Sequence, residues 1–252
     1  MWSHRAFKAI TPLKIVLLIG QTIAGQNCLW VWVRDHRQHH RHSDTHGDPH
    51  NASNGFFFSH IGWLMSKKHP EVIAKGKLID MSDLEADPWV MFQKDHYKKL
   101  YFLFAFLVPV LVPIVCWDET VFNSVMVAFF ARAIITINGT WMVNSWAHKF
   151  GTRPFTRDIL PTDTHLVALI ALGEGWHNYH HTFPWDYRAA EAGSPLNLTR
   201  RLIEGMAAWG WVYDLKAATP GMVKARVLAK GDGSHPLWGH STFEEFQQHE
   251  NR

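Results

Sequence analysis

Two long apolar stretches, separated by a short acidic turn, are the clearest pattern in the chain. Residues 100–117 read LYFLFAFLVPVLVPIVCW without a charge, and residues 120–143 carry a single charge, Arg132. Each stretch is long enough to cross about 30 Å of hydrocarbon at about 1.5 Å per residue. Only Asp118 and Glu119 separate them. The pattern predicts a transmembrane hairpin with spans at 100–117 and 120–143, in which Arg132 is paired near the far membrane face because a lone charge in a span is costly.

Basic residues flank this hairpin on both outer sides: Lys94, Lys98, Lys99, Lys149, Arg153 and Arg157. Because lysine and arginine favour the cytosolic side of a membrane, we expect both outer ends in the cytosol and the acidic turn on the far side. The alternative is a pair of buried helices in a soluble protein. Pro109 and Pro113 favour the membrane, where prolines in helices are tolerated.

A third apolar stretch, IVLLIGQTIAGQNCLWVWV at residues 15–33, is interrupted by Gln21, Gln26 and Asn27. Such interruptions suit a helix that lies in the membrane interface or lines a cavity better than one that faces lipid. We therefore predict that this stretch does not span the bilayer.

Histidine is unusually frequent, with 18 copies among 252 residues. Six of them form two triads with the spacing His-x-x-His-His: His36, His39, His40, His177, His180 and His181. Residues at i, i+3 and i+4 share one face of a helix, so each triad presents three rings together. His148 stands at the cytosolic exit of the second span. The histidines predict a site for two metal ions, and the alternative is a solvated basic patch.

The ligand type and the setting together indicate iron. Imidazole binds zinc, copper, iron and nickel, but zinc sites close at about four ligands and at least seven histidines are well placed here. A redox-active pair beside a membrane suits oxygen activation against an inert lipid C–H bond. Only two cysteines occur, which excludes thiolate metal sites, and a net charge of +3 is too small to suggest a nucleic-acid partner.

These observations predict an all-α integral membrane protein in which a transmembrane hairpin carries a cytosolic helical cap with the histidines. Six segments resemble, in order, the membrane acyl-CoA desaturases of the stearoyl-CoA desaturase type: MWSHRAFKA, WVRDHRQHH, DPHNASNGFFFSHIGWLM, NGTWMVNSWAH, GEGWHNYHHTFPWDY and GDGSH. The resemblance runs from the first residue to about residue 235 and looks closest to the insect members.

The resemblance implies a non-haem di-iron oxidoreductase of the endoplasmic reticulum membrane, multi-pass, with its active site facing the cytosol. Such an enzyme takes electrons from cytochrome b5, uses O2 and inserts a cis double bond into a fatty acyl chain carried on coenzyme A. The implied iron ligands, with Asn144 acting through water, are His4, His36, His39, His40, Asn144, His148, His177, His180 and His181. The family does not use the positions of His42, His46, His50 and His60 as ligands.

Substrate-binding residues also follow from the resemblance. The bend of the family's kinked acyl tunnel matches Gln26, Trp32 and Thr140, and its coenzyme A surface matches Arg34, Asp35, Lys67 and Lys68. Two of these assignments have simpler alternatives. The lysine pair could be an ordinary membrane-edge pair, and Trp32 could be a core residue.

The chain departs from the family at its start. The family's first histidine box reads His-Arg-x-x-x-His, and Met1 occupies its third position. We therefore expect the first ligand and the two preceding membrane helices to be missing from this sequence. Residues 1–235 would be an N-terminally truncated desaturase domain and residues 236–252 a polar tail. The sequence would be either a fragment of a working desaturase or a short product that is inactive because its iron site is incomplete.

Two other function classes are compatible with a histidine-rich membrane protein. A lipid hydroxylase would use the same metal cluster but rebound oxygen onto the substrate. A catalytically inactive desaturase-like partner or a zinc transporter would bind without catalysis. Transporters place their ligands near the bilayer midplane within the spans, whereas both triads here lie outside the hairpin.

Overall fold

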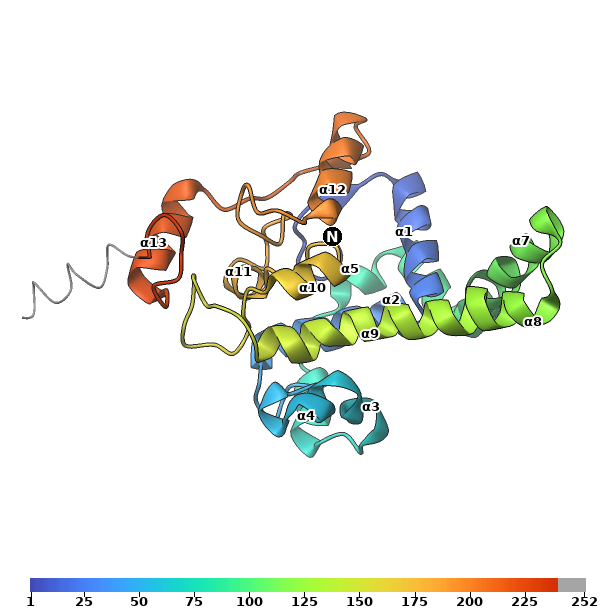
Figure 1. Cartoon of the computed structure of the whole chain (residues 1–252), viewed down its shortest axis with the longest axis horizontal. Helices are drawn as coiled ribbons and strands as arrows, with labels where there is room; N and C mark the ends of the chain where they lie inside the picture. Colours follow the sequence, from blue (N-terminus) through green and yellow to red (C-terminus); the bar gives the residue numbers. More distant parts are fainter. Residues whose placement is uncertain (240–252) are drawn as a thin grey trace, which may run out of the picture.

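Two long helical arms dominate the computed structural model, which describes residues 1–239 (Figure 1). The first arm consists of α6 (Pro88–Tyr101), the π-helical segment η3 (Phe102–Leu107) and α7 (Val108–Trp117). The second consists of α8 (Val121–Ser124), π-helical η4 (Val125–Ala131), α9 (Arg132–Ser145) and the 3-10 turn η5 (Trp146–His148). Both arms are long and apolar enough to cross a membrane, which confirms the hairpin. Each arm extends beyond its expected span on the side away from the turn.

The arms expose most of their apolar side chains. Only 11% of the most apolar window of the first arm and 6% of that of the second are buried within the protein. Exposed apolar surface of this extent needs a lipid environment. The structure therefore contradicts the alternative of two buried helices in a soluble protein.

Local signals define the turn between the arms. Asp118 ends α7 in the left-handed conformation at φ 56°, which aspartate tolerates better than most residues. The Thr120 hydroxyl then accepts a hydrogen bond from the backbone N–H of Asn123 and caps α8. The chain reverses direction within these few residues, as the sequence predicts.

The third apolar stretch forms two helices, and the expectation of one helix is wrong. α1 (Thr11–Ala24) and α2 (Leu29–His42) meet at an angle of 81°. Gly25 adopts φ 72° at the break, and a Cβ there would lie 2.9 Å from the Tyr101 ring. Only glycine satisfies both constraints without strain. The bend turns α2, with its histidine triad, away from α1.

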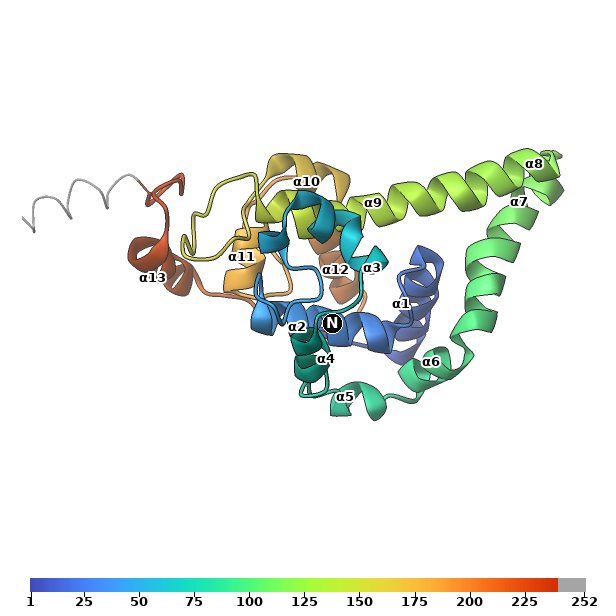
Figure 2. The same ribbon diagram turned by 90° about the horizontal axis from the view of Figure 1, so that it is seen from below.

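α1 lies between the two arms of the hairpin (Figure 2). Arg132 ties the three helices together by donating hydrogen bonds to the backbone carbonyls of Ile23 at 2.8 Å and Ala105 at 2.5 Å. Both carbonyls lack an ordinary helical partner. That of Ile23 belongs to the last turn of α1, and that of Ala105 lies four residues before Pro109, which has no N–H to donate. Arg132 is thus paired, but with carbonyls between the arms and not near the turn.

The remaining elements form the cap on the histidine end of the hairpin. They are β1 (Lys8–Ala9), η1 (Ala52–Asn54), η2 (Phe58–Gly62), α3 (Trp63–Met65), α4 (Pro70–Gly76), α5 (Ser82–Glu85), α10 (His165–Ile170), α11 (His177–Thr182), α12 (Leu198–Ala208), β2 (Val212–Tyr213) and α13 (Pro220–Lys230). β1 and β2 pair antiparallel, with Lys8 opposite Tyr213. The predicted all-α class is confirmed, since these two-residue strands are the only sheet in residues 1–239.

Two of the apolar cores in the cap hold the helices that carry the histidine triads. One packs α2 on α5 and α6 through Leu29, Val33, Leu84 and Val90. The other surrounds α11, where Tyr179 is fully buried against Phe155 and α13. These cores fix α2 and α11, the two helices that carry the histidine triads. The expected tail from residue 236 lies, from residue 240 onward, outside the described residues.

Candidate metal centre and substrate site

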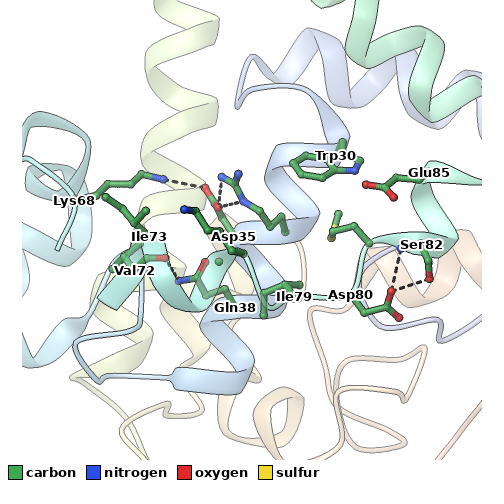
Figure 3. Close-up of a pocket in the computed structure, with 14 residues that line it drawn as sticks. Trp30, Asp35, Gln38, Lys68, Val72, Ile73, Ile79, Asp80, Ser82 and Glu85 are labelled. Atoms are coloured by element: carbon green, nitrogen blue, oxygen red, sulfur yellow. Dashed lines mark hydrogen bonds and ion pairs between the residues drawn. The ribbon is translucent and has the colours of Figure 1, made fainter. Parts of the chain in front are cut away.

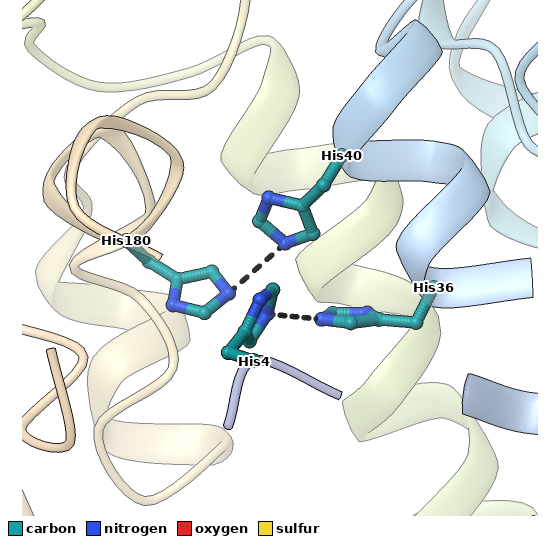
Figure 4. A group of neighbouring side chains, drawn as sticks. All are labelled: His4, His36, His40 and His180. Carbon is teal, nitrogen blue, oxygen red and sulfur yellow. Dashed lines mark hydrogen bonds between the residues drawn. The ribbon is translucent and has the colours of Figure 1, made fainter. Parts of the chain in front are cut away.

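Eight of the nine predicted metal ligands are histidines, and the structure gathers all eight into two groups of four. The first, which we call the His4 group, contains His4, His36, His40 and His180 (Figure 4). The second, the His148 group, contains His39, His148, His177 and His181. Within each group the ligand atoms all lie within 4.8 Å of one another.

Each triad supplies two histidines to one group and one histidine to the other. From α2, the i and i+4 residues enter the His4 group while His39 at i+3 enters the His148 group. From α11, the i and i+4 residues enter the His148 group while His180 at i+3 enters the His4 group. Because i+3 and i+4 differ by about 100° around a helix, two facing helices can supply both groups at once. This reciprocal sharing places the groups side by side.

The imidazole nitrogens point at one another as metal ligands do. The Nε2 atoms of His4 and His36 are 2.8 Å apart, and those of His40 and His180 are 3.1 Å apart. In the other group the Nε2 atom of His177 lies 3.1 Å from that of His148 and 3.1 Å from that of His181. Two nitrogens bound at right angles to one ion, at about 2.1 Å each, lie about 3.0 Å apart. Each group therefore fits a metal ion.

Burial favours the neutral imidazole that a metal requires. It lowers the pKa of His4 well below the ordinary value, and the neighbouring His180 adds to this shift. Burial, followed by the repulsion of His39, lowers the pKa of His180 to about 4. The pKa of His181 is lowered by burial and by His177. Neutral imidazoles have a free lone pair at neutral pH, so these residues could ligate a metal without first losing a proton.

The other histidines considered in the sequence are placed differently. His42, His46 and His60 lie outside every candidate ligand group of residues 1–239. His50 is buried beside His39 and forms a further candidate group with His39 and Asp48, although the family resemblance does not use it. Asn144 is half-buried on α9, one turn before His148. Its role as a water-mediated ligand stays a prediction.

The three predicted tunnel residues are joined by hydrogen bonds. Gln26 donates through Nε2 to the Thr140 hydroxyl at 2.7 Å, and its Oε1 accepts from the Trp32 indole N–H at 3.0 Å. The Trp32 ring also stacks on His36, with centroids 4.8 Å apart and planes 14° from parallel. The trio thus connects the break between α1 and α2, the second arm, and the His4 group. Trp32 is half-buried and also packs against the apolar core around Leu29 and Val33, so its place in the tunnel stays a prediction.

Three of the four predicted coenzyme A residues line one pocket of about 540 Å³ (Figure 3). Arg34 donates to Asp35 at 2.6 Å, and the Lys68 ammonium lies 3.6 Å from the same carboxylate. Trp30 and Glu85 lie at the other end of the lining. Lys67 faces a neighbouring pocket instead.

Comparison with known proteins agrees with this geometry. Residues 1–192 match the family described as fatty acid desaturase. The chain is 51% identical over 240 residues to the acyl-CoA Delta-9 desaturase of Acheta domesticus, which covers 95% of this chain and 67% of that protein. It is 50% identical over 235 residues to the stearoyl-CoA desaturase of Homo sapiens, covering 93% and 66%, and 49% identical over 241 residues to the acyl-CoA Delta(11) desaturase of Trichoplusia ni, covering 95% and 69%.

The chain belongs to the fatty acid desaturase family. Its similarity to named acyl-CoA desaturases, insect enzymes among them, makes it a member of the acyl-CoA desaturase oxidoreductases. The chain spans about two thirds of the length of the curated relatives it matches.

Two aspartates that hydrogen-bond to the metal-ligating histidines of this desaturase were not identified from the sequence. His39 Nδ1 lies 2.8 Å from Asp48 Oδ2, and His148 Nδ1 lies 3.0 Å from Asp44 Oδ2. Burial alone would raise the pKa of Asp48, but the attraction of His39 and His50 holds it below the ordinary value. In the sequence these two aspartates look like ordinary polar loop residues. Their position just after the first histidine triad is the one feature that could have indicated a role beside the metal site.

The segment that carries His4 is held by a second arrangement that the sequence did not reveal. Arg37, on α2, donates to the backbone carbonyls of Trp2 at 2.7 Å and Ser3 at 3.0 Å. Its guanidinium also makes two hydrogen bonds to Asp83, at 2.7 and 2.8 Å. A guanidinium can use five fixed N–H donors in this way. Arg37 therefore fixes the backbone of Trp2 and Ser3, the two residues that precede His4.

Proposed function

We propose that this desaturase binds one iron ion in each histidine group and inserts a cis double bond into the acyl chain of a saturated fatty acyl-CoA. The observation that carries the proposal is the pairing of two four-imidazole groups with the Gln26–Trp32–Thr140 trio beside one of them. Two adjacent nitrogen-rich sites suit a redox-active pair better than structural zinc, which closes a single tetrahedral site.

The metal pair, when bound, would supply the oxygen chemistry that removes hydrogen from an unactivated C–H bond. The chain's own residues would hold it and orient the substrate. The eight imidazoles present their Nε2 atoms to the two groups, while the Trp32 ring covers His36 and shields that side of the centre from water. The hydrogen bonds of Gln26 hold its own side-chain amide and the Trp32 ring in place. The part of the tunnel wall at which an acyl chain would bend is therefore rigid.

The pocket beside α2 has the chemistry for the polar end of the substrate. Arg34 and Lys68 can bind phosphate oxygens, and Trp30, with Lys94 4.0 Å above its ring, lines the same pocket. Asp35 already pairs with both cations, so it orients them and lowers their net charge. A coenzyme A group in this pocket would stand at the side of α2 that leads to Trp32, one turn of helix before His36.

We further propose that the protein resides in the endoplasmic reticulum membrane with both histidine groups facing the cytosol, where cytochrome b5 would deliver electrons. The support for this orientation is the distribution of lysine and arginine around the hairpin. A glycosylation acceptor inserted between Asp118 and Glu119 with a spacer should be modified, and one inserted after His235 should not. The reverse pattern would contradict this orientation.

The decisive experiment measures metal and product on the same preparation. Protein purified in detergent from iron-supplied cells should contain two irons per chain. With O2, a reductant, cytochrome b5 and stearoyl-CoA, gas chromatography of the acyl chains should show a monounsaturated product. Two zinc ions per chain would contradict the di-iron centre, and a hydroxylated product would assign the chain to the related oxygenases.

A further inference from the structure

Among residues 1–239, carboxylates hydrogen-bond to the imidazoles of only one of the two histidine groups. Asp48 and Asp44 contact the Nδ1 atoms of His39 and His148, both members of the His148 group. No carboxylate of residues 1–239 hydrogen-bonds to an imidazole of the His4 group. Each group also has one Nδ1 atom, that of His180 and that of His177, that is buried without a hydrogen-bond partner in that part of the chain, so the difference between the groups lies in the carboxylates. The two groups therefore have the same ligands and different surroundings.

The two aspartates belong to a loop that is shaped around them. Asp44 adopts φ 60°, and its N–H donates to Asp48 Oδ2 at 2.8 Å. The N–H groups of His50 and Ala52 donate to Asp48 Oδ1 and Asp44 Oδ1, both at 3.1 Å. The Asp48 side chain is 0% exposed and that of Asp44 is 9% exposed. Burying two charges is costly unless each is paired, so this loop is built to keep both carboxylates in place.

A carboxylate at Nδ1 determines how the ring can serve a metal. The Nδ1–H group donates to the carboxylate, which fixes the tautomer with its lone pair on Nε2 and holds the plane of the ring. It also makes the imidazole a stronger donor to the metal. Both effects act on His39 and His148, whose Nε2 atoms point into the His148 group.

We propose that Asp44 and Asp48 are positioning residues that make the His148 group the tighter of the two metal sites. This inference rests on the proposed function, because it requires that both groups bind metal. It predicts two inequivalent ions. The ion in the His148 group binds first and leaves last, and the ion in the His4 group exchanges more easily.

Iron release to a chelator tests the proposal without relying on activity. Release from the unsubstituted protein should show two phases of equal amplitude. Asp48→Asn and Asp44→Asn should each accelerate the slow phase about 10- to 100-fold, the usual effect of losing such a partner on metal affinity. Asparagine has the same shape but lacks the charge, and its amide can donate to Nδ1 and favour the wrong tautomer. Asp158→Asn, on an exposed carboxylate that pairs with Lys230, is the matched control and should change neither phase.

A second measurement covers the case in which a variant fails to fold. Iron titrated into the unsubstituted metal-free protein should bind in two classes that differ by about tenfold or more in affinity. Two equal classes, or a slow phase unchanged in both variants with two irons still bound, would overturn the proposal while leaving the di-iron function intact. A protein that binds no iron would overturn the proposed function itself.

Discussion

The His4 group and the His148 group contain four imidazoles each, yet three of the four are half-buried in the first and three of the four are buried in the second. The His148 group draws its ligands from α2, α11 and the end of the second arm, and two of its rings have carboxylate partners. The His4 group includes a residue from a loop, which Arg37 holds through backbone carbonyls. Identical ligands thus do not make identical sites, because the surrounding atoms decide how firmly each ring is held.

Two single substitutions, each of which removes one ligand from one of the groups, are the most severe test of the comparison between the His4 group and the His148 group. His40→Ala and His181→Ala should each lower desaturation by about a thousandfold or more, because the ligands act as a unit and a lost one opens a coordination position. Membrane insertion should be unchanged, since no apolar burial is lost. The measurement is gas chromatography of fatty acids in a desaturase-deficient host. His96→Ala, on an exposed face of α6, is the control. Activity retained by either ligand variant would show that its group is dispensable.

Loosening the support of His4 should affect one group alone. Arg37→Met removes the hydrogen bonds to Trp2, Ser3 and Asp83, so His4 loses its fixed backbone. We expect iron affinity of the His4 group to fall about tenfold while the His148 group keeps its ion. Iron content after brief chelation measures this. Arg41→Met on the exposed face of the same helix should leave both ions bound. Loss of both ions from the Arg37 variant would show that the groups are not independently supported.

The tunnel trio sharpens the comparison, because Trp32 stacks on His36 and so connects the trio to the His4 group. Trp32→Phe preserves the stack on His36 and removes the indole N–H that donates to Gln26. Losing one hydrogen bond worth about 1 kcal/mol should lower kcat/KM about fivefold. Both ions should remain bound, and the double-bond position should become less uniform, as gas chromatography with mass spectrometry can measure. A fall in iron content would assign Trp32 to metal support instead of substrate positioning.

Asp186 accepts a hydrogen bond from Tyr179 on α11, the helix that supplies ligands to both groups, and its substitution should have the smallest effect on the protein. Burial alone would raise the pKa of Asp186, but hydrogen bonds from Arg188, from the Ala218 N–H and from the Tyr179 hydroxyl hold it below its usual value. A lowered folded-state pKa stabilises the protein above the unfolded pKa of about 3.9, and this stability is lost as pH falls below it. Asp186→Asn should therefore cost about 1 kcal/mol at neutral pH and flatten the acid-side fall in melting temperature. An unchanged acid profile would contradict this role.

The hairpin and the ligand residues could be predicted because their signals are local. A charge-free run of membrane length and the His-x-x-His-His spacing need no knowledge of distant residues. The resemblance to the family supplied His4, whose ligand role no local pattern reveals. The sequence also suggested that Arg132 would be paired. It did not reveal that the partners are carbonyls of Ile23 and Ala105, since these residues are far from Arg132 in the chain.

The tertiary structure alone decided how the histidines divide between the groups. Helical periodicity places three rings on one face, but only the placement of α11 opposite α2, with their histidine rings in contact, sends His39 and His180 to opposite groups. The break at Gly25 depends on the approach of Tyr101, and the contact of Gln26 with Thr140 joins residues 114 positions apart. Asp44 and Asp48 become metal-supporting residues only when their loop brings them behind His148 and His39. Side-chain pattern along a chain reports local periodicity, whereas these contacts depend on which distant surfaces pack together.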